Sequence, residues 1–244
     1  MAMVRRAQRT TTSMSMLASL DDYGLGGVEC EICGNKGYVV RKDEQGNVVS
    51  SECRCMAQRR SMRKLRESGM LDMIARYTFE TYQANDEKRD KIKRTAEGFA
   101  DGDDGWMYVF GRSGSGKTHI CTAACVRLIS RGIEVYYMSW RDESTALKSL
   151  VMDSDSYEKK MRKLKTVPVL YIDDFFKGGF TDADIRLAFE IINARYNDTS
   201  LRTIISSEVG LETLVKMDEA LGGRIYERSR GHIINTPDSN WRMQ

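Results

Sequence analysis

The stretch GRSGSGKT, residues 111–118, decides the fold class of this chain. It matches the pattern G-x-x-x-x-G-K-[ST], and it stands between an apolar run, WMYVF at 106–110, and a sequence of helical character at 117–131. A strand, a glycine-rich loop and a helix in this order form a phosphate-binding loop, because the glycines let backbone N–H groups face a phosphate and the helix N-terminus adds partial positive charge. We therefore predict a P-loop nucleotide site.

The loop pattern also predicts a role for its side chains. Lys117 is expected to reach the β- and γ-phosphates of ATP, and the Thr118 hydroxyl is expected to ligate Mg²⁺. The alternative is a glycine-rich loop with a chance Lys-Thr pair, and the motif and its context together argue against it. The predicted ATP-binding residues of this segment are Gly111, Arg112, Ser113, Gly114, Ser115, Gly116, Lys117, Thr118 and His119.

Outward from the loop, strand and helix patterns alternate along the chain. Further apolar strands are expected at 133–138, 167–172, 202–206 and 232–235. The helices expected around them lie at 86–100, 142–152, 155–164, 181–196, 210–217 and 218–228. Such alternation predicts an α/β fold with a parallel sheet that helices cover on both faces.

The strand VPVLYIDDF, 167–175, carries two acids at its C-terminal end. Parallel sheets bind ligands at the carboxyl ends of their strands. Asp173 is therefore expected to hold Mg²⁺ through water, and Asp174 to polarise the water that attacks the γ-phosphate. The alternative for each aspartate is capping of the turn that follows.

The strand RTIISSE, 202–208, also ends in polar residues. One of Ser206, Ser207 and Glu208 is expected to sense the γ-phosphate, and Ser207 is counted among the predicted nucleotide contacts. The choice among the three stays open. N-capping of the next helix by Ser207 or Glu208 explains the same residues equally well.

The six cysteines divide into two groups. Cys121 and Cys125 are spaced i, i+4 on the helix after the loop and are predicted to be small core residues. Cys30, Cys33, Cys53 and Cys55 form two close pairs around a predicted hairpin, GYVVRKDEQGNVVSSE, which brings the pairs together. Four thiolates satisfy a tetrahedral structural zinc site, and unligated thiols or a disulfide are the alternative.

A basic segment follows the cysteines. Arg54, Arg59, Arg60, Arg63, Lys64 and Arg66 precede the first acid, Glu67, on a sequence of helical periodicity. Contact with nucleic acid, contact with an acidic protein surface and a solvated helix face all remain open. Near the C-terminus, the alternatives for the arginines are a solvated helix face or an arginine finger that acts on the γ-phosphate of a neighbouring subunit. The candidates are Arg224, Arg228, Arg230 and Arg242.

Composition limits the classes of protein. The chain has 244 residues, of which 41% are hydrophobic and 30% charged, with a net charge of +3. No apolar run approaches the roughly 18 residues that a membrane span needs, so we expect a cytoplasmic protein without membrane contact. The boundaries predicted are a flexible tail at 1–27, a four-cysteine zinc-binding module at 28–57, a basic linker helix at 58–75 and an ATPase domain at 76–244.

The ordered set of motifs over about residues 28–244 resembles the AAA+ helicase loaders of the DnaC/DnaI type. It comprises CxxC…CxC, the basic helix, GRSGSGKTH, Asp173-Asp174, TIISSE, and LGGRIYERSRG followed by NWR. The resemblance implies that Arg224 is the arginine finger, with Arg228 second, and that Arg242 is the sensor-2 arginine. The chain departs from the family at the strand-4 sensor, where Glu208 aligns with a position that is often Asn.

The resemblance implies an ATPase that self-associates and loads a replicative DnaB-type hexameric helicase onto single-stranded DNA. Three other functions fit parts of the sequence: a transposition accessory ATPase of the IstB type, a small-molecule kinase, and a zinc adaptor that binds ATP without hydrolysing it. The zinc module favours the loader over the IstB type. The paired aspartates and the terminal arginines favour water over a small-molecule acceptor.

Overall fold

The computed structural model describes residues 30–67, 71–102 and 104–237. The predicted tail at 1–27 and Arg242 lie outside these residues. The strands are β1 (Tyr38–Lys42), β2 (Val48–Glu52), β3 (Met107–Phe110), β4 (Val135–Ser139), β5 (Val169–Phe175), β6 (Arg202–Ser207) and β7 (Ile233–Asn235). The helices are α2 (Cys55–Glu67), α3 (Leu71–Arg76), α4 (Glu87–Asp101), α5 (Lys117–Ser130), α6 (Trp140–Ser149), α7 (Ser154–Thr166), α8 (Asp182–Tyr196), α9 (Leu211–Met217) and α10 (Glu219–Arg228).

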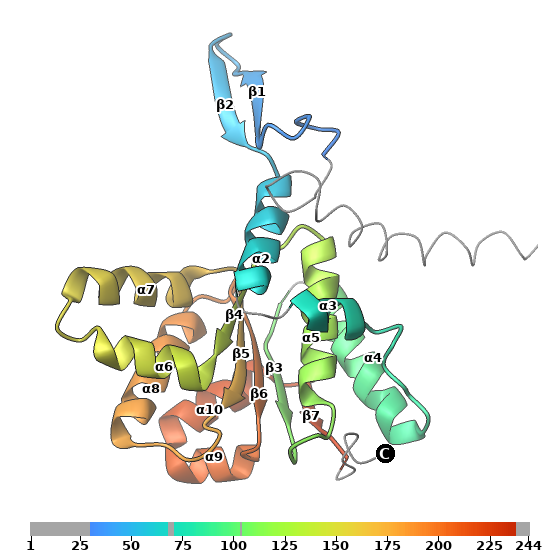
Figure 1. Cartoon of the computed structure of the whole chain (residues 1–244), viewed down its shortest axis with the longest axis vertical. Coiled ribbons are helices and arrows are strands. Elements are labelled where there is room, and N and C mark those ends of the chain that lie inside the picture. Colours follow the sequence, from blue (N-terminus) through green and yellow to red (C-terminus); the bar gives the residue numbers. More distant parts are fainter. Residues whose placement is uncertain (1–29, 68–70, 103, 238–244) are drawn as a thin grey trace, which may run out of the picture.

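A five-stranded parallel sheet organises the larger part of the chain and confirms the predicted fold class. Its strand order is β4-β5-β6-β3-β7, so β6 lies between the strand that leads into the glycine loop and the strand that carries the two aspartates. Helices α3, α4 and α5 cover one face of the sheet, and α6 to α10 cover the other (Figure 1). The carboxyl ends of β3, β5 and β6 therefore meet at one edge.

The strands are apolar on both faces because both faces are covered. Met107 and Val109 pack with α4 and α5, whereas Tyr108, between them, packs with the helices of the opposite face. In β5, Tyr171 and Ile172 divide between the two faces in the same way. This alternation with a period of two fixes which side chain faces which layer.

A small hairpin stands apart from this core. Strands β1 and β2 pair antiparallel, and the hairpin projects from the end of α2 away from the sheet (Figure 1). Its buried residues are Cys33, Cys53 and Cys55, against which Cys30, Val39 and Met56 pack. The hairpin expected between the cysteine pairs is thus present.

Two expected boundaries shift in an informative way. The strand expected at 167–172 is β5, Val169–Phe175, which continues through both aspartates. It continues because the β5–β6 pairing resumes at Phe175 opposite Ser207 after a register shift at Asp173 and Asp174. The linker helix expected at 58–75 corresponds to α2 and α3, and α2 begins at Cys55, so the fourth cysteine lies in its first turn.

Candidate nucleotide and metal sites

The glycine loop lies between β3 and α5, as predicted from its sequence. Gly114 and Gly116 have φ of 76° and 94°, which a residue with a side chain rarely adopts. Gly116 precedes α5, and Lys117 is its first residue, so the unpaired N–H groups of the helix start at the loop. This geometry suits a phosphate, because the helix N-terminus supplies both donors and partial positive charge.

The start of the loop is braced by Thr236, which follows β7. The Thr236 N–H donates to the Phe110 carbonyl at 2.9 Å, and its hydroxyl lies 2.6 Å from the Ser115 hydroxyl. Gly111 has φ of 149°, and a Cβ added there would stand 2.1 Å from Thr236 Oγ1. Glycine at 111 is therefore required by contact with the C-terminal segment as well as by the turn. Ser115, a predicted ATP contact, is buried in this brace.

Lys117 is held within the loop. Its ammonium donates to the carbonyl oxygens of Gly111 at 2.8 Å and Arg112 at 2.9 Å. Burial lowers the pKa of Lys117, and the nearby carboxylates of Glu208 and Asp174 act in the opposite direction. The three charged groups thus lie close enough to affect one another at the mouth of the loop.

The two aspartates of β5 face different surroundings. The Asp173 carboxylate is buried and accepts hydrogen bonds from the hydroxyls of Tyr171 at 2.7 Å, Tyr137 at 3.1 Å and Ser206. Asp174 has φ of 54°, in the left-handed region, and its side chain lines the cavity described below. A register shift of this kind re-aims a side chain, and here it directs the second acid outward.

The polar end of β6 contributes one acid to the cavity. Ser206 accepts from the Asp174 N–H at 3.0 Å and donates to Asp173. Ser207 donates to the Phe175 carbonyl at 2.7 Å and accepts from the Val209 N–H at 3.0 Å. Both serine side chains are fully buried, whereas Glu208 is exposed and lines the cavity. The two serines brace β5 against β6.

A cavity of about 250 Å³ joins these elements. Lys117, Asp174, Lys177 and Glu208 form a charged group beside the glycine loop, which we call the phosphate end. Four further lining residues come from residues 77–83, between α3 and α4. The full lining is Tyr77, Thr81, Tyr82, Gln83, Ser113, Gly114, Gly116, Lys117, Thr118, His119, Asp174, Lys177 and Glu208.

Three aromatic rings lie together in the lining of the cavity. His119 stacks on Tyr77, with ring centroids 4.7 Å apart, and meets Tyr82 edge-on at 5.2 Å. Its Nε2 lies 3.1 Å from the Thr78 carbonyl and 3.3 Å from the Thr81 hydroxyl. Burial lowers the pKa of His119, which favours the neutral ring. Flat, partly buried rings beside a phosphate loop provide a surface on which a nucleobase can stack.

Sequence reasoning missed five of the lining residues: Tyr77, Thr81, Tyr82, Gln83 and Lys177. They carry no motif, and four of them precede the loop by more than 25 positions. Of the loop and strand residues that the sequence did predict as nucleotide or magnesium contacts, Gly111, Arg112, Ser115, Asp173 and Ser207 are absent from the lining. Gly111 and Arg112 contribute their carbonyls to Lys117, and the other three side chains support the site from within the core.

Arg224 and Arg228 lie outside this cavity. The Arg224 guanidinium stacks over Phe189 and Tyr196 of α8, at 5.0 and 5.5 Å from their ring centroids. Arg228 donates to the Thr199 carbonyl at 3.0 Å, just before β6 begins. Arg228 therefore ties α10 to the amino-terminal edge of the sheet, the edge opposite the glycine loop.

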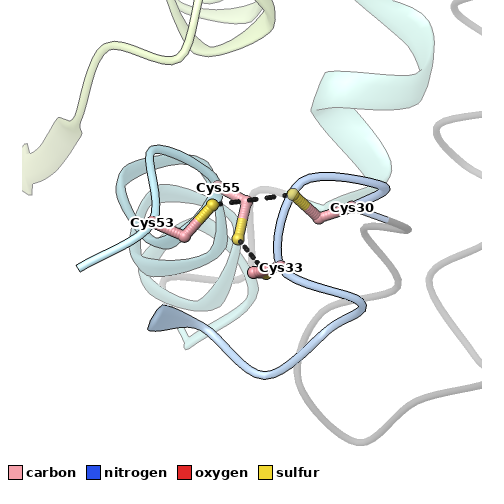
Figure 2. A group of neighbouring side chains, drawn as sticks. All are labelled: Cys30, Cys33, Cys53 and Cys55. Carbon is pink, nitrogen blue, oxygen red and sulfur yellow. Dashed lines mark hydrogen bonds between the residues drawn. The ribbon is translucent and has the colours of Figure 1, made fainter. Parts of the chain in front are cut away.

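The four N-terminal cysteines converge on one point (Figure 2). Their sulfur atoms all lie within 4.8 Å of one another, with Cys30–Cys53 at 3.7 Å and Cys33–Cys55 at 3.6 Å. A tetrahedral zinc with Zn–S bonds of about 2.3 Å would place its sulfurs roughly 3.8 Å apart. The cluster can therefore accept a metal ion with little movement of its ligands.

Burial and the neighbouring sulfurs raise the pKa of Cys55 to about 12. Burial also raises the pKa of Cys33, but hydrogen bonds from the Gly37 N–H and from the other thiols outweigh it and lower the value to about 6. Cys121 and Cys125 belong to α5 and are buried in the core, in agreement with the prediction that they are core residues, and burial raises the pKa of both thiols.

Two arginines of the basic segment are used within the chain. Arg59 is buried and donates to Asn35 Oδ1 at 2.8 Å, next to the cysteine cluster. Arg60 pairs with Glu52 of the hairpin and, at 3.1 Å, with Glu134 just before β4. Arg54 and Arg63 are exposed, and the side chains of Lys64 and Arg66 lie outside the described part of the chain.

The sheet order, the glycine loop at the start of α5 and the acids at the ends of β5 and β6 define an AAA+ type P-loop nucleotide-binding domain. The chain belongs to the family of IstB-like ATP binding proteins, whose model matches residues 35–244. No helix within 30–67, 71–102 and 104–237 is long and apolar enough to cross a membrane.

Known relatives agree with this assignment. The phage-like element PBSX protein XkdC of Bacillus subtilis (strain 168) is 31% identical over 222 residues, which cover 84% of this chain and 81% of that protein. The replicative helicase loader DnaC of Escherichia coli (strain K12) is 25% identical over 195 residues, 77% of each chain. The crystal structure of DnaI shares the fold, with a TM-score of 0.57 and 23% identity over 69% of this chain and 95% of DnaI.

Proposed function

We propose that the protein hydrolyses ATP in the cavity between the glycine loop and the ends of β5 and β6. The observation that carries this proposal is that Lys117, Asp174 and the stacked rings of His119 and Tyr77 all line a single cavity. Such a lining fits a nucleotide whose phosphates lie on the loop and whose base lies among the rings. The membership of an ATP-binding family supports the same ligand.

Each residue at the phosphate end has a separate proposed role. Lys117 leaves the loop carbonyls to contact the β- and γ-phosphates, and the loop N–H groups receive the β-phosphate. Thr118 and, through water, Asp173 would hold Mg²⁺, which would neutralise phosphate charge. Asp174 accepts a hydrogen bond from the attacking water and orients it. A buried lysine whose bonds are made only to carbonyls can change partners when an anion enters.

ATP affinity tests this site most directly. Lys117→Ala removes a charge-assisted contact of about 1.5–3 kcal/mol, so ATP should bind roughly ten- to a hundredfold more weakly, as measured by titration calorimetry. Lys216→Ala, on the exposed face of α9, is the matched control and should bind ATP as the wild type does. An unchanged dissociation constant for Lys117→Ala would remove the site assignment.

The cysteine cluster is proposed as a structural zinc site with Cys30, Cys33, Cys53 and Cys55 as ligands. Four thiolates complete the tetrahedron and leave no position for a substrate, so the metal would serve folding alone. The separation of the sulfurs supports this, and so do the contacts of Arg59 and Val39 that wrap the cluster.

The biological role we propose is that of an ATP-dependent loader for a replicative DnaB-type hexameric helicase, acting in the cytoplasm. The likeness to DnaC supports it. The hairpin adds a second argument, because Tyr38, Val40 and Val48 point to one side of it and are 50%, 57% and 70% exposed. Apolar side chains grouped on one exposed face are typical of a protein interface. Single-stranded DNA and further copies of this chain complete the proposed partners.

The loader role is tested by complex formation with the purified helicase of the same host. We expect a complex on size exclusion that changes its affinity for single-stranded DNA when ATP is added. Val40→Ser/Val48→Ser should weaken this complex, whereas Arg41→Ser on the opposite face of β1 should leave it intact. If the two purified proteins form no complex at micromolar concentrations (about 8 kcal/mol of binding free energy), the loader proposal is overturned.

A transposition accessory ATPase is the second candidate, because the matching family takes its description from IstB. The two roles differ in the partner, a transposase in one case and a helicase in the other. Stimulation of strand transfer, with no effect on helicase loading, would favour the second role. ATP binding without measurable turnover would instead favour an adaptor.

A further inference from the structure

Lys177 is a cation in the nucleotide cavity that no sequence motif explains. Its ammonium lies 2.8 Å from Asp174 Oδ2 and 3.7 Å from Glu208 Oε1, so it stands between the two acids at the phosphate end. The hydrogen bond that it donates to Asp174 raises the pKa of Lys177, which keeps it charged. About two fifths of its side chain is exposed, which leaves it room to move.

The root of this side chain is fixed although its tip is not. Asp174 and Phe176 both have left-handed φ, of 54° and 57°, and the Lys177 N–H donates to the Asp174 carbonyl at 3.0 Å. Phe175 and Phe176 stack at 4.0 Å and pack against Trp140, which buries the turn. Strained backbone persists where the surroundings determine it and is concentrated at functional sites. The four-carbon stem of Lys177 therefore pivots from a rigid point.

The cavity needs a cation at this position. Asp174 and Glu208 line its phosphate end, and a terminal phosphate arriving there meets two carboxylates. Lys117 faces the loop carbonyls from the other side. Like charges at close range cost free energy unless a cation separates them. Among the described residues that line this end, Lys177 is the cation that stands between the acids.

The strand that usually supplies a neutral sensor offers none here. The hydroxyls of Ser206 and Ser207 are buried and committed to Asp173, Asp174, Phe175 and Val209. The remaining candidate, Glu208, is an anion and repels phosphate by itself. Detection of the γ-phosphate must therefore come from a group outside β6.

We propose that Lys177 is the residue that distinguishes nucleoside triphosphate from diphosphate. With a diphosphate bound, its ammonium stays on Asp174 and Glu208. With a triphosphate bound, it transfers to the γ-phosphate and thereby releases Asp174. The freed carboxylate orients a water whose oxygen bonds to the γ-phosphorus as the bond to the β–γ bridging oxygen breaks, and the proton of that water passes to Asp174. This proposal rests on the proposed hydrolysis of ATP in the same cavity.

Binding measurements distinguish recognition of the γ-phosphate by Lys177 from a contact that Lys177 would make with any bound nucleotide. We compare the dissociation constants of ADP and of AMPPCP, an ATP analogue that is not hydrolysed, for the wild type, Lys177→Met and Lys177→Arg. Lys177→Met should weaken AMPPCP about tenfold or more and leave ADP within twofold, because a charge-assisted contact is lost only with the triphosphate. Lys177→Arg should retain most of the discrimination. Lys216→Met, outside the cavity, should behave as the wild type.

The outcomes are distinct. A wild-type ratio of the two constants in Lys177→Met, or an equal weakening of both ligands, overturns the role of Lys177 while the nucleotide site stands. Failure of the wild type to bind either ligand overturns the proposed function itself. The selective loss of AMPPCP, restored by arginine, is the result that supports the proposal.

Discussion

The hairpin module and the nucleotide domain are built on different sources of stability. In the domain, two clusters of buried side chains lie on either face of a five-stranded sheet, and the site forms where several strands end. In the module, the buried residues are Cys33, Cys53 and Cys55, and the hairpin strands are mostly exposed. One region is held by a hydrophobic core and the other by its thiols. Loss of a single ligand should therefore affect the two regions very differently.

Removal of zinc from the cysteine cluster should change the stability of the hairpin module more than any other substitution changes either region. Structural zinc contributes on the order of 10 kcal/mol to the folding of small modules. Without the metal, packing of the three buried cysteines cannot supply a comparable free energy. We expect one zinc per chain by elemental analysis, none in Cys53→Ser, and loss of the hairpin signals in an NMR spectrum. The ATP dissociation constant should stay within twofold.

Cys121→Ala is the matched control, because that thiol lies in the domain core, and it should keep one zinc. A metal-free wild type with four freely titratable thiols would contradict the site. Loss of ATP binding together with zinc would instead show that the domain depends on the module.

The next largest effect concerns Arg224. Its guanidinium rests on two aromatic rings outside the cavity of its own chain, so any action on phosphate must occur in a neighbouring copy. Arginine fingers increase hydrolysis by about 10³–10⁵ where they act in trans. Arg224→Ala should lose activity to that degree, and mixing it with Lys117→Ala should restore part of it. A mixture as inactive as its parts, under conditions that assemble the wild type, would refute this role and make Arg228 the next residue to test.

Asp174 should have a smaller effect, confined to the chemical step. A positioned carboxylate contributes about 10²–10⁴ in rate. We expect Asp174→Asn to lower kcat by that factor with little change in KM, because the contact with water matters only in the transition state. Normal hydrolysis by this variant would leave Asp174 as a turn residue bonded to Lys177. Steady-state kinetics at saturating ATP provide the measurement.

The two regions also differ in how far their sequences predicted them. The four cysteines could be assigned as one cluster because a metal site depends on a short, local spacing. The loop was equally readable, since Gly116 and Lys117 act next to each other in sequence. The rest of the site could not be read in this way. Lys177 and Thr236 reach it through the order of the strands, Tyr77 reaches it through the packing of α3 on α5, and nothing near these residues in sequence marks a ligand.

The aspartates show the limit most clearly. One sequence pattern predicted a role in the site for both adjacent acids, but their surroundings differ: Asp173 is buried among three hydroxyls, while Asp174 faces the cavity. The difference arises from the register shift between β5 and β6, which depends on Ser206 and Ser207 in another strand. Long-range pairing of this kind leaves no local pattern in the chain.

The smallest effect expected is at the junction of the two regions. Arg60 contacts Glu52 of the hairpin and Glu134 of the domain, and Glu134 also pairs with Lys163 at 2.5 Å. Arg60 is more than a third exposed, so each pair should contribute only about 0.2–1 kcal/mol, less at high salt. Arg60→Met, Glu134→Gln and the double variant form a cycle in which the coupling free energy can be measured by denaturant unfolding. We expect a coupling below about 1 kcal/mol, with zinc content and ATP affinity unchanged in all three variants.

Arg63→Met, an exposed arginine one turn further along α2, is the control and should show no coupling to Glu134. A coupling of several kcal/mol would mean that the module and the domain unfold as one unit, and the contrast between a thiol-held region and a core-held region would no longer describe this protein.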